Sequence, residues 1–354
     1  MNPEGARALP TTSQFVASVT PTPLVPIRIG DAAPPVWCKL EFINPSGSTK
    51  DRVAAHILLR AHREGALRPD STVVEASSGS TSIAMALVCA QLGVRFVAVM
   101  PEGVSNERAQ LIQAYGGEVE RVGKDAGMER CIARAREVAR DCDGFLPDQF
   151  ANPENANAHR FGTAREILAQ IPGGVVDGVV AGVGTGGTLA GVTRGLKDAG
   201  CSPRMFAAKP LMLVRSGACG CSGAMHCFCD AECSSFSSRI PGVVDNMSRL
   251  FSAEERDSLD IVEVEDSFAL DVTKRLHHLG FPVGPSSGLN VAAALQVGEQ
   301  LGSESTVVTV LPDRIERYFS TGLLEDDTST EAKSSAGDSC CGEEHAGAKE
   351  AADR

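Results

Sequence analysis

Short apolar runs rich in β-branched residues alternate with segments of helical periodicity along most of the chain. Residues 73–76 predict a buried strand, residues 81–92 an apolar helix that Gly93 ends, and residues 94–100 the next strand. Because strands and helices alternate, the pattern indicates a mostly parallel sheet with helices on both faces. The alternation continues as helix, strand and helix through residues 106–115, 118–122 and 128–140.

A second group of elements predicts a larger lobe, so we expect an α/β protein with two lobes, each a mostly parallel twisted sheet flanked by helices. Its strands are expected at residues 175–183, 261–264 and 307–311, and its helices at residues 188–199, 268–279 and 289–301. The predicted organisation is an N-terminal arm (1–19), a catalytic region (20–325) whose smaller lobe covers about residues 50–160, and a disordered acidic tail (326–354).

Charge and composition exclude several classes of function. The formal net charge is -12 and no basic patch is interleaved with aromatic residues, so binding to nucleic acid is not expected. No apolar run reaches the roughly 18 residues that cross a bilayer, and residues 1–14 lack the apolar core of a secretory signal. We therefore expect a cytoplasmic protein that acts on a small molecule, with its twelve cysteines largely reduced.

A turn-rich segment, Asn44-Pro45-Ser46-Gly47-Ser48-Thr49, leads to Lys50 at the start of a helix predicted over residues 49–63. The positive end of a helix and enclosure in a cleft both lower the pKa of an ammonium group. A neutral lysine amine is a nucleophile toward carbonyl groups and a usable base. The alternative is a solvated lysine without a chemical role.

A second turn, residues 75–82, reads Glu-Ala-Ser-Ser-Gly-Ser-Thr-Ser and joins a buried strand to a helix. Hydroxyl groups and backbone N–H groups at a helix N-terminus bind a carboxylate or a phosphate without a cationic side chain. The simpler interpretation is that Ser80 or Thr81 caps the helix.

The third turn is the glycine-rich run at residues 182–191, again between a strand and a helix. Glycines let the backbone approach an oxyanion closely, and the helix dipole favours the negative charge. A dinucleotide site is the competing interpretation, but the spacing does not fit G-x-G-x-x-G and the lysine of a P-loop is missing. A single phosphate group fits better.

A fourth turn, Gly284-Pro285-Ser286-Ser287-Gly288, precedes the helix predicted at residues 289–301 and offers another hydroxyl group at a strand-to-helix corner. By itself the signal is weak, and helix capping is the better interpretation.

The order of these segments resembles the cysteine synthase and cystathionine β-synthase family of pyridoxal-phosphate-dependent enzymes, the fold type II group, over about residues 20–324. Thr22-Pro23-Leu24 resembles the opening T-P-L of the family, and residues 44–52 resemble its N-P-S-x-S-x-K-x-R segment. Further family blocks are similar to residues 149–153, 184–188, 286–288 and 316–321.

The resemblance implies pyridoxal 5'-phosphate as cofactor, Lys50 as the lysine that carries it, and Ser286 as the residue facing its pyridine nitrogen. A cup for the cofactor phosphate is implied at Gly184, Thr185, Gly186, Gly187 and Thr188. The substrate carboxylate is implied at Ser77, Ser78, Thr81 and Gln149. A homodimer is also implied.

The implied reaction is β-replacement on an O-activated L-serine, either O-acetylserine or O-phosphoserine, with sulfide or a related nucleophile. A neutral hydroxyl group at the pyridine nitrogen favours departure of a β-substituent over transamination. Ser80 stands where the family has an asparagine that contacts the cofactor's phenolic oxygen, and residues 75–81 and 240–245 resemble a cysteine desulfhydrase branch. Elimination of sulfide from cysteine is therefore an alternative, and a non-catalytic sensor is a third hypothesis.

An unusual cysteine cluster lies between the phosphate loop and Ser286. Its thiols suggest zinc or another thiophilic metal, or a redox pair, although the C-x-C spacing differs from the common C-x-x-C. Inert reduced thiols in a surface loop are the alternative. The candidate ligands are Cys219, Cys221, Cys227, Cys229 and Cys233, with His226 among them.

Overall fold

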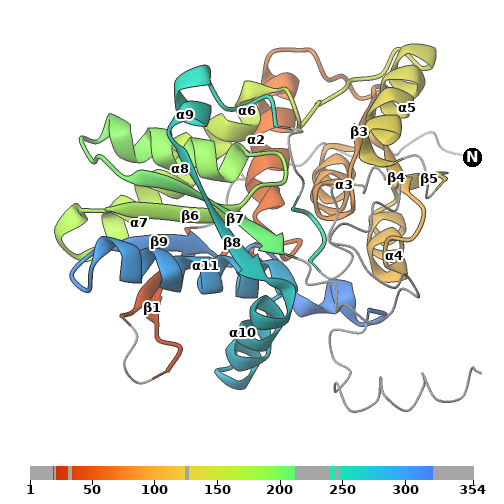
Figure 1. Ribbon diagram of the computed structural model, residues 1–354. Coiled ribbons are helices and arrows are strands. Elements are labelled where there is room, and N and C mark those ends of the chain that lie inside the picture. Colours follow the sequence, from red (N-terminus) through yellow and green to blue (C-terminus); the bar gives the residue numbers. More distant parts are fainter. Residues whose placement is uncertain are drawn as a thin grey trace, which may run out of the picture.

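The protein is described by a computed structural model that covers residues 19, 21–30, 34–123, 127–211, 240–243 and 248–321. Two separate sheets organise these residues, one of six strands and one of three. Figure 1 shows the larger sheet on the left, the smaller sheet on the right, and α2 (Lys50–Arg63) between them. The described residues thus confirm the α/β class expected from the sequence pattern.

The larger sheet has the strand order β1-β2-β9-β6-β7-β8. Only the pairing of β1 with β2 is antiparallel; the other neighbours run parallel. The carboxyl ends of β6 and β9 therefore meet at the same edge, which is where open α/β sheets bind ligands. The strands are β1 (Leu24–Ile27), β2 (Val36–Lys39), β6 (Gly178–Gly182), β7 (Arg204–Leu211), β8 (Leu259–Glu265) and β9 (Val307–Val310).

Helices cover both faces of the larger sheet (Figure 1). α10 (Asp266–His278) and α11 (Pro285–Leu301) pack on one face, and α7 (Ala164–Gln170) and α8 (Gly187–Asp198) pack on the other. The central strands β6 and β9 are buried on both sides, which explains their continuous apolar sequence, whereas the edge strand β8 is mostly not buried and carries charged residues. Shorter elements are η1 (Glu41–Ile43), α6 (Pro153–Ala158), the π-helical η3 (His159–Thr163), η4 (Pro172–Gly174), α9 (Ala253–Asp257) and η5 (Ile315–Tyr318).

The smaller sheet is parallel and has the order β3-β4-β5. Its central helix α3 is apolar on all sides and correspondingly buried along nearly its whole length. Cys89 and Cys131, which the sequence pattern assigns to the core, are fully buried. The elements are β3 (Thr72–Ala76), β4 (Arg95–Pro101), β5 (Glu118–Val122), α3 (Ser80–Leu92), α4 (Asn106–Ala114) and α5 (Gly127–Asp141).

Two predicted boundaries differ from the structure by more than two residues. The strand expected at residues 175–183 begins only at Gly178, because a 3-10 turn at Pro172–Gly174 precedes it. The helix expected at residues 289–301 begins at Pro285, since proline suits the first position of a helix. Ser286 consequently lies in the first turn of α11.

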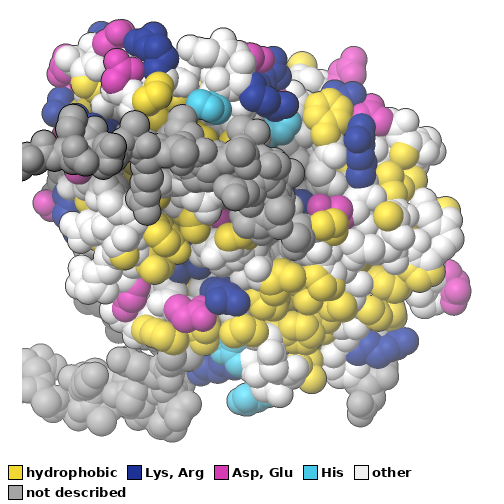
Figure 2. Space-filling model, turned by 180° about the vertical axis from the view of Figure 1, so that it is seen from behind, with side chains coloured by type: hydrophobic (Ala, Val, Ile, Leu, Met, Phe, Trp, Pro, Cys, Tyr) yellow, Lys and Arg dark blue, Asp and Glu magenta, His cyan; other side chains and the backbone are white. Residues whose placement is uncertain are grey.

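The face opposite to the view of Figure 1 carries a broad patch of hydrophobic side chains (Figure 2). A patch of this kind is typical of surfaces that another protein chain covers. It is compatible with the homodimer that the resemblance implies, which stays a prediction. Within the described part of the chain, no helix is long and apolar enough to cross a membrane.

A buried network of ion pairs fixes the start of α2 between the two sheets. The guanidinium group of Arg52 binds Glu41 (Nε to Oε2, 2.6 Å) and Glu166 (Nη1 to Oε1, 2.6 Å), and Lys39 Nζ lies 2.8 Å from Glu166 Oε2. Lys39 and Glu41 are completely buried. Burial raises the pKa of Glu41, but the charge and hydrogen bonds of Arg52, the hydrogen bond from Thr22 and the charge of Lys39 together hold that pKa below its usual value. Each charge is tolerated because its partners are present.

We expect Glu166→Gln to lower the free energy of unfolding by about 3 kcal/mol, because Lys39 and Arg52 would keep buried charges with fewer partners. The measurement is urea unfolding of the apoprotein. Asp260→Asn serves as the control, since it breaks the exposed pair with Arg204 and should cost less than about 1 kcal/mol. Equal effects of the two variants would contradict this view of the network.

Candidate active site

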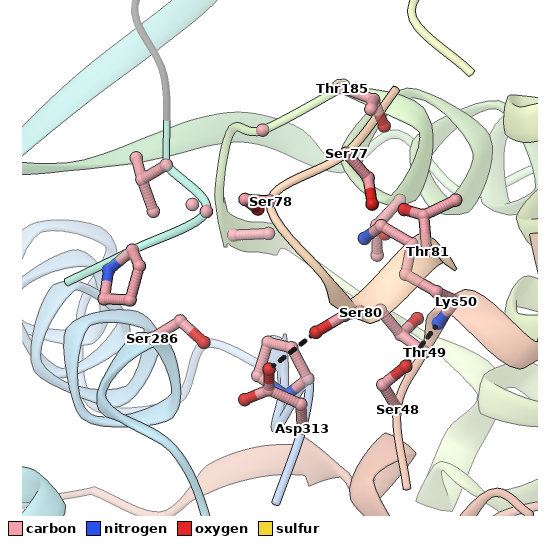
Figure 3. Close-up of a pocket in the computed structure, with 18 of the residues that line it drawn as sticks. Ser48, Thr49, Lys50, Ser77, Ser78, Ser80, Thr81, Thr185, Ser286 and Asp313 are labelled. Atoms are coloured by element: carbon pink, nitrogen blue, oxygen red, sulfur yellow. Dashed lines mark hydrogen bonds between the residues drawn. The ribbon is translucent and has the colours of Figure 1, made fainter. Parts of the chain in front are cut away.

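One cavity lies where the N-terminal ends of α2, α3, α8 and α11 converge at the carboxyl edges of the two sheets. It brings together every predicted cofactor and substrate residue except Gly187, which lies just behind its wall. Figure 3 shows Lys50 on one side of this cavity and Ser286 on the other. The predicted residues that line it are Lys50, Ser77, Ser78, Ser80, Thr81, Gln149, Gly184, Thr185, Gly186, Thr188 and Ser286.

The turn before Lys50 is held by the residue that follows it. The carboxylate of Asp51 accepts hydrogen bonds from Ser46 N (3.1 Å), Ser46 Oγ (2.8 Å) and Ser48 N (3.2 Å). Burial raises the pKa of Asp51 to about 6, against the lowering effect of these donors. Lys50 therefore starts α2 in a fixed position, with its backbone N–H donating to Ser48 Oγ (3.3 Å, Figure 3).

The side chain of Lys50 points into the cavity without a counterion in contact. Its amine makes no hydrogen bond or ion pair with any of the described residues. Burial lowers the pKa of this amine, and the more distant carboxylates of Asp313 and Glu41 oppose that shift only in part. The amine is thus more often neutral than that of a solvated lysine, as nucleophilic attack on a carbonyl group requires.

The loop between β3 and α3 is stabilised by its own side chains. Ser77 Oγ accepts from the backbone N–H groups of Gly79 (3.1 Å) and Ser82 (3.2 Å), so Ser77 takes the capping role. The expectation that Ser80 or Thr81 caps the helix is wrong, because Ser80 Oγ donates to Asp313 Oδ2 (3.1 Å) and Thr81 Oγ1 donates to Gln149 Oε1 (2.6 Å).

Gln149 is attached to this loop through both ends of its amide group. Its Nε2 donates to Ala76 O (2.7 Å), its Oε1 accepts from Thr81, and its backbone N–H donates to Glu75 Oε2 (3.1 Å). Burial raises the pKa of Glu75 to about 8. Gln149 therefore has a fixed position beside the N-terminus of α3, although it is 68 residues away from Thr81 in the sequence.

The glycine-rich loop between β6 and α8 has a shape that side chains would prevent. A Cβ atom on Gly184 would lie 2.4 Å from the carbonyl oxygen of Gly242, and one on Gly186 would lie 2.3 Å from Ser248 Oγ. Gly186 also has a φ of +83°, which favours glycine. The loop leads into α8, whose first backbone N–H groups have no partners within the helix.

Asn290 joins the two central strands at the edge of the cavity. Its Oδ1 accepts from the backbone N–H of Gly182 (2.7 Å), and its Nδ2 donates to Val310 O (2.9 Å). Ser286 lies one turn earlier on α11, and its hydroxyl group has no hydrogen-bond partner among the described residues. That hydroxyl group is available to a ligand in the cavity.

Besides Asn290, the cavity residues Asp313, Tyr318 and Arg108 were not assigned to the site from the sequence. Asp313 accepts hydrogen bonds from Ser80 and from Tyr318 OH (2.8 Å), and the guanidinium carbon of Arg108 lies 4.9 Å from the centre of the Tyr318 ring. Tyr318 belongs to a segment, residues 316–321, whose resemblance to the family was visible in the sequence. Asp313 and Arg108 had no such signal, since isolated charged residues are usually solvated.

The cysteine cluster proposed as a metal site lies outside the described residues. This concerns Cys219, Cys221, Cys227, Cys229 and Cys233, and the thiophilic metal or redox role assigned to them stays a prediction. Among residues whose positions are described, no group of three or more His, Cys, Asp or Glu side chains is arranged to hold a metal ion.

Comparison with known proteins identifies the family. Residues 17–313 match the family model described as "Pyridoxal-phosphate dependent enzyme". This chain belongs to that family. Its relatives include a cysteine synthase of Staphylococcus aureus, which is 38% identical over 314 residues that cover 86% of this chain and 95% of the relative.

Solved structures of the pyridoxal-phosphate family share the fold of this chain. A hydrogen sulfide-producing enzyme from Fusobacterium nucleatum has a TM-score of 0.76 and 32% identity, over 89% of this chain and 92% of that enzyme. O-ureido-L-serine synthase has a TM-score of 0.74 and 33% identity, over 90% and 98% of the two chains. The protein is therefore a fold type II, pyridoxal-phosphate-dependent enzyme of the cysteine synthase type.

The residues of the cavity fit pyridoxal phosphate. An aldehyde requires an amine that is neutral and unpaired, which Lys50 offers. A phosphate group requires donors and close backbone approach, which the glycine loop, Thr185, Thr188 and the N-terminus of α8 offer. The cofactor accordingly explains why glycines and hydroxyl groups, and few charged side chains, line the cavity.

The lowered pKa of Lys50 predicts unusual reactivity of its amine in the apoprotein. At pH 8, we expect a small acylating reagent to modify Lys50 faster than the exposed Lys197, because a larger fraction of the Lys50 amine is neutral. Raising the pH should reduce the difference as other amines lose their protons. Peptide mapping by mass spectrometry measures both rates, and slower labelling of Lys50 at every pH would contradict the assignment.

Proposed function

We propose that the protein catalyses β-replacement on an O-activated L-serine, with sulfide or a related nucleophile, and uses pyridoxal phosphate held on Lys50. The observation that carries this proposal is the convergence of the Lys50 amine, the glycine loop at residues 184–188, the hydroxyl-rich turn at residues 77–81 and Ser286 on one cavity. The Staphylococcus aureus relative named cysteine synthase supports the same reaction class.

Lys50 has two roles in the proposed reaction. It carries the cofactor in the resting enzyme, and once substrate has displaced it, its amine takes the proton from the substrate's α-carbon. Burial suits this step, because a lowered pKa keeps the amine free to accept a proton near neutral pH. When bound, pyridoxal phosphate supplies the electron sink that stabilises negative charge at that carbon.

The other residues bind and orient. Gly184, Thr185, Gly186, Gly187 and Thr188 are proposed to hold the cofactor phosphate. Ser286 is proposed to face the pyridine nitrogen, where a hydroxyl group leaves the nitrogen without the proton that an aspartate would enforce. This choice favours departure of the β-substituent over transamination.

The substrate carboxylate is proposed to bind at the N-terminus of α3. Ser78 and Thr81 line the cavity there, and Gln149 is held beside them by its hydrogen bonds to Thr81 and Ala76. The hydroxyl group of Ser77 is already used within the loop, so Ser77 contributes by holding the backbone N–H groups in place. The positive end of the helix dipole adds to the attraction.

Elimination of sulfide from cysteine is a second candidate, and one observation favours it. Ser80, at the asparagine position of the family, donates its hydroxyl proton to Asp313 and is therefore engaged away from a cofactor oxygen. A relative of known structure is described as a hydrogen sulfide-producing enzyme. If water ends the reaction in place of a nucleophile, the products are pyruvate and ammonia.

We expect Lys50→Ala to abolish the absorbance band of the bound cofactor and to lower turnover by at least about 10²–10⁴-fold, because both the cofactor link and the base are lost. The assay incubates the wild type and the variant with O-acetylserine, O-phosphoserine or cysteine, with and without sulfide, and identifies the products. Lys197→Ala is the control.

Product identity separates the two candidates. Cysteine formed from a serine ester and sulfide supports replacement, whereas pyruvate and sulfide formed from cysteine alone support elimination. A cofactor band that persists in Lys50→Ala, and that borohydride reduction removes while leaving the cofactor attached to another lysine, would refute the role of Lys50.

A further inference from the structure

Two polar side chains lie directly behind the glycine loop and contact its threonines. Asn155 is on α6, and His159 begins the π-helical segment η3. They are four residues apart, so they share one face of this helical stretch. Both are buried, Asn155 to 1% exposure and His159 to 0%. π-Helical segments are rare and occur often at functional sites.

The hydrogen bonds of Asn155 fix the direction of its amide group. Its Nδ2 lies 2.8 Å from Gln149 O and 2.9 Å from Thr185 Oγ1. Because a carbonyl oxygen only accepts, the atom that faces Gln149 O must be the amide nitrogen. The same nitrogen therefore donates to Thr185, and the hydroxyl proton of Thr185 remains free to point elsewhere.

His159 lies between two threonine hydroxyl groups. Its Nδ1 is 2.9 Å from Thr163 Oγ1, and its Nε2 is 3.2 Å from Thr188 Oγ1. Burial lowers the pKa of His159 well below its usual value, and the charges of Lys50 and Arg52 lower it further. The ring is consequently neutral, with one nitrogen that donates and one that accepts.

Close packing of two helices lets these side chains reach the loop. A Cβ atom on Gly187 of α8 would lie 2.0 Å from Asn155 Oδ1, and one on Gly191 would lie 2.7 Å from His159 Cβ. A Cβ atom on Gly191 would also lie 2.1 Å from the carbonyl oxygen of Ala156. The two glycines, one helical turn apart, thus leave room for Asn155 and His159.

We propose that Asn155 and His159 are positioning residues that turn the hydroxyl protons of Thr185 and Thr188 toward the cofactor phosphate, with His159 in the Nε2–H form. A hydroxyl group can donate or accept, but a phosphate dianion offers only acceptors. By satisfying each threonine oxygen from behind, the pair leaves each hydroxyl proton for the phosphate. Thr163 in turn donates to Nδ1 of His159. The inference rests on the proposed phosphate cup.

The test compares binding of pyridoxal phosphate and of pyridoxal, which lacks the phosphate group, to the apoprotein. His159→Leu removes the donor and should weaken pyridoxal phosphate about tenfold or more, with pyridoxal unchanged. His159→Gln keeps an N–H donor at similar reach and should retain most of the affinity. Asn157→Ala, on the same helix but away from the loop, is the matched control.

A double substitution separates orientation from simple packing. In a Thr188→Val background the hydroxyl group is already absent, so His159→Leu should cause no further loss of affinity. Asn155→Ala combined with Thr185→Val is expected to behave in the same way. Additive losses would overturn the proposal, as would an equal loss of affinity for pyridoxal phosphate and pyridoxal.

The tautomer of His159 can be measured in the wild-type protein, so this test does not depend on a variant that folds. A long-range ¹H–¹⁵N spectrum of the histidine-labelled protein should show His159 with its proton on Nε2, and a proton on Nδ1 would overturn the inference alone. A wild-type apoprotein that binds neither pyridoxal phosphate nor pyridoxal would instead overturn the proposed function, and this inference with it.

Discussion

The position of Lys50 depends on the buried ion pairs of Arg52, which lies two residues further along the chain. Arg52 is held by Glu41 and Glu166, and Lys39 completes the network between β2, α2 and α7. Each of these groups would be costly to bury alone, and together they compensate one another. These ion pairs hold the first turn of α2 against the larger sheet, and they thereby also set the position of Lys50 in that turn.

In contrast to this buried network of ion pairs, the cavity is lined by few charged side chains. Among the described residues that line it, only Lys50, Arg108 and Asp313 carry charged groups. The other lining residues offer hydroxyl groups, glycine backbone and helix N-termini, which are groups that bind an anion without a cationic side chain. Strong ion pairs outside the cavity thus hold a lysine that stays unpaired inside it.

The sequence predicted local features well and long-range pairing poorly. The turns around Lys50, Ser77 and Gly184 were expected at helix starts from the local pattern, whereas their meeting in one site was implied only by the resemblance to the family. In contrast, Asp313 is 233 residues from Ser80, and nothing periodic joins them.

The pair behind the glycine loop was missed for a related reason. Asn155 and His159 lie in a stretch, residues 153–170, without clear apolar periodicity, and their meaning depends on α8 packing against it. The sequence placed Gly187 in a phosphate loop. The structure shows a second constraint on this position, because a Cβ atom there would clash with Asn155. Such a reason becomes visible only when both helices are in place.

Two side-chain hydrogen bonds connect the two lobes. Ser80 of the smaller lobe donates to Asp313 of the larger lobe, and Ser105 Oγ donates to Arg317 O (2.7 Å) nearby. Loss of the first bond would free the Ser80 hydroxyl group for a ligand. The residue at the family's asparagine position therefore has two alternative partners, Asp313 and the cavity. Ser80 can donate to a ligand only by giving up its bond to Asp313, because its hydroxyl group has a single proton.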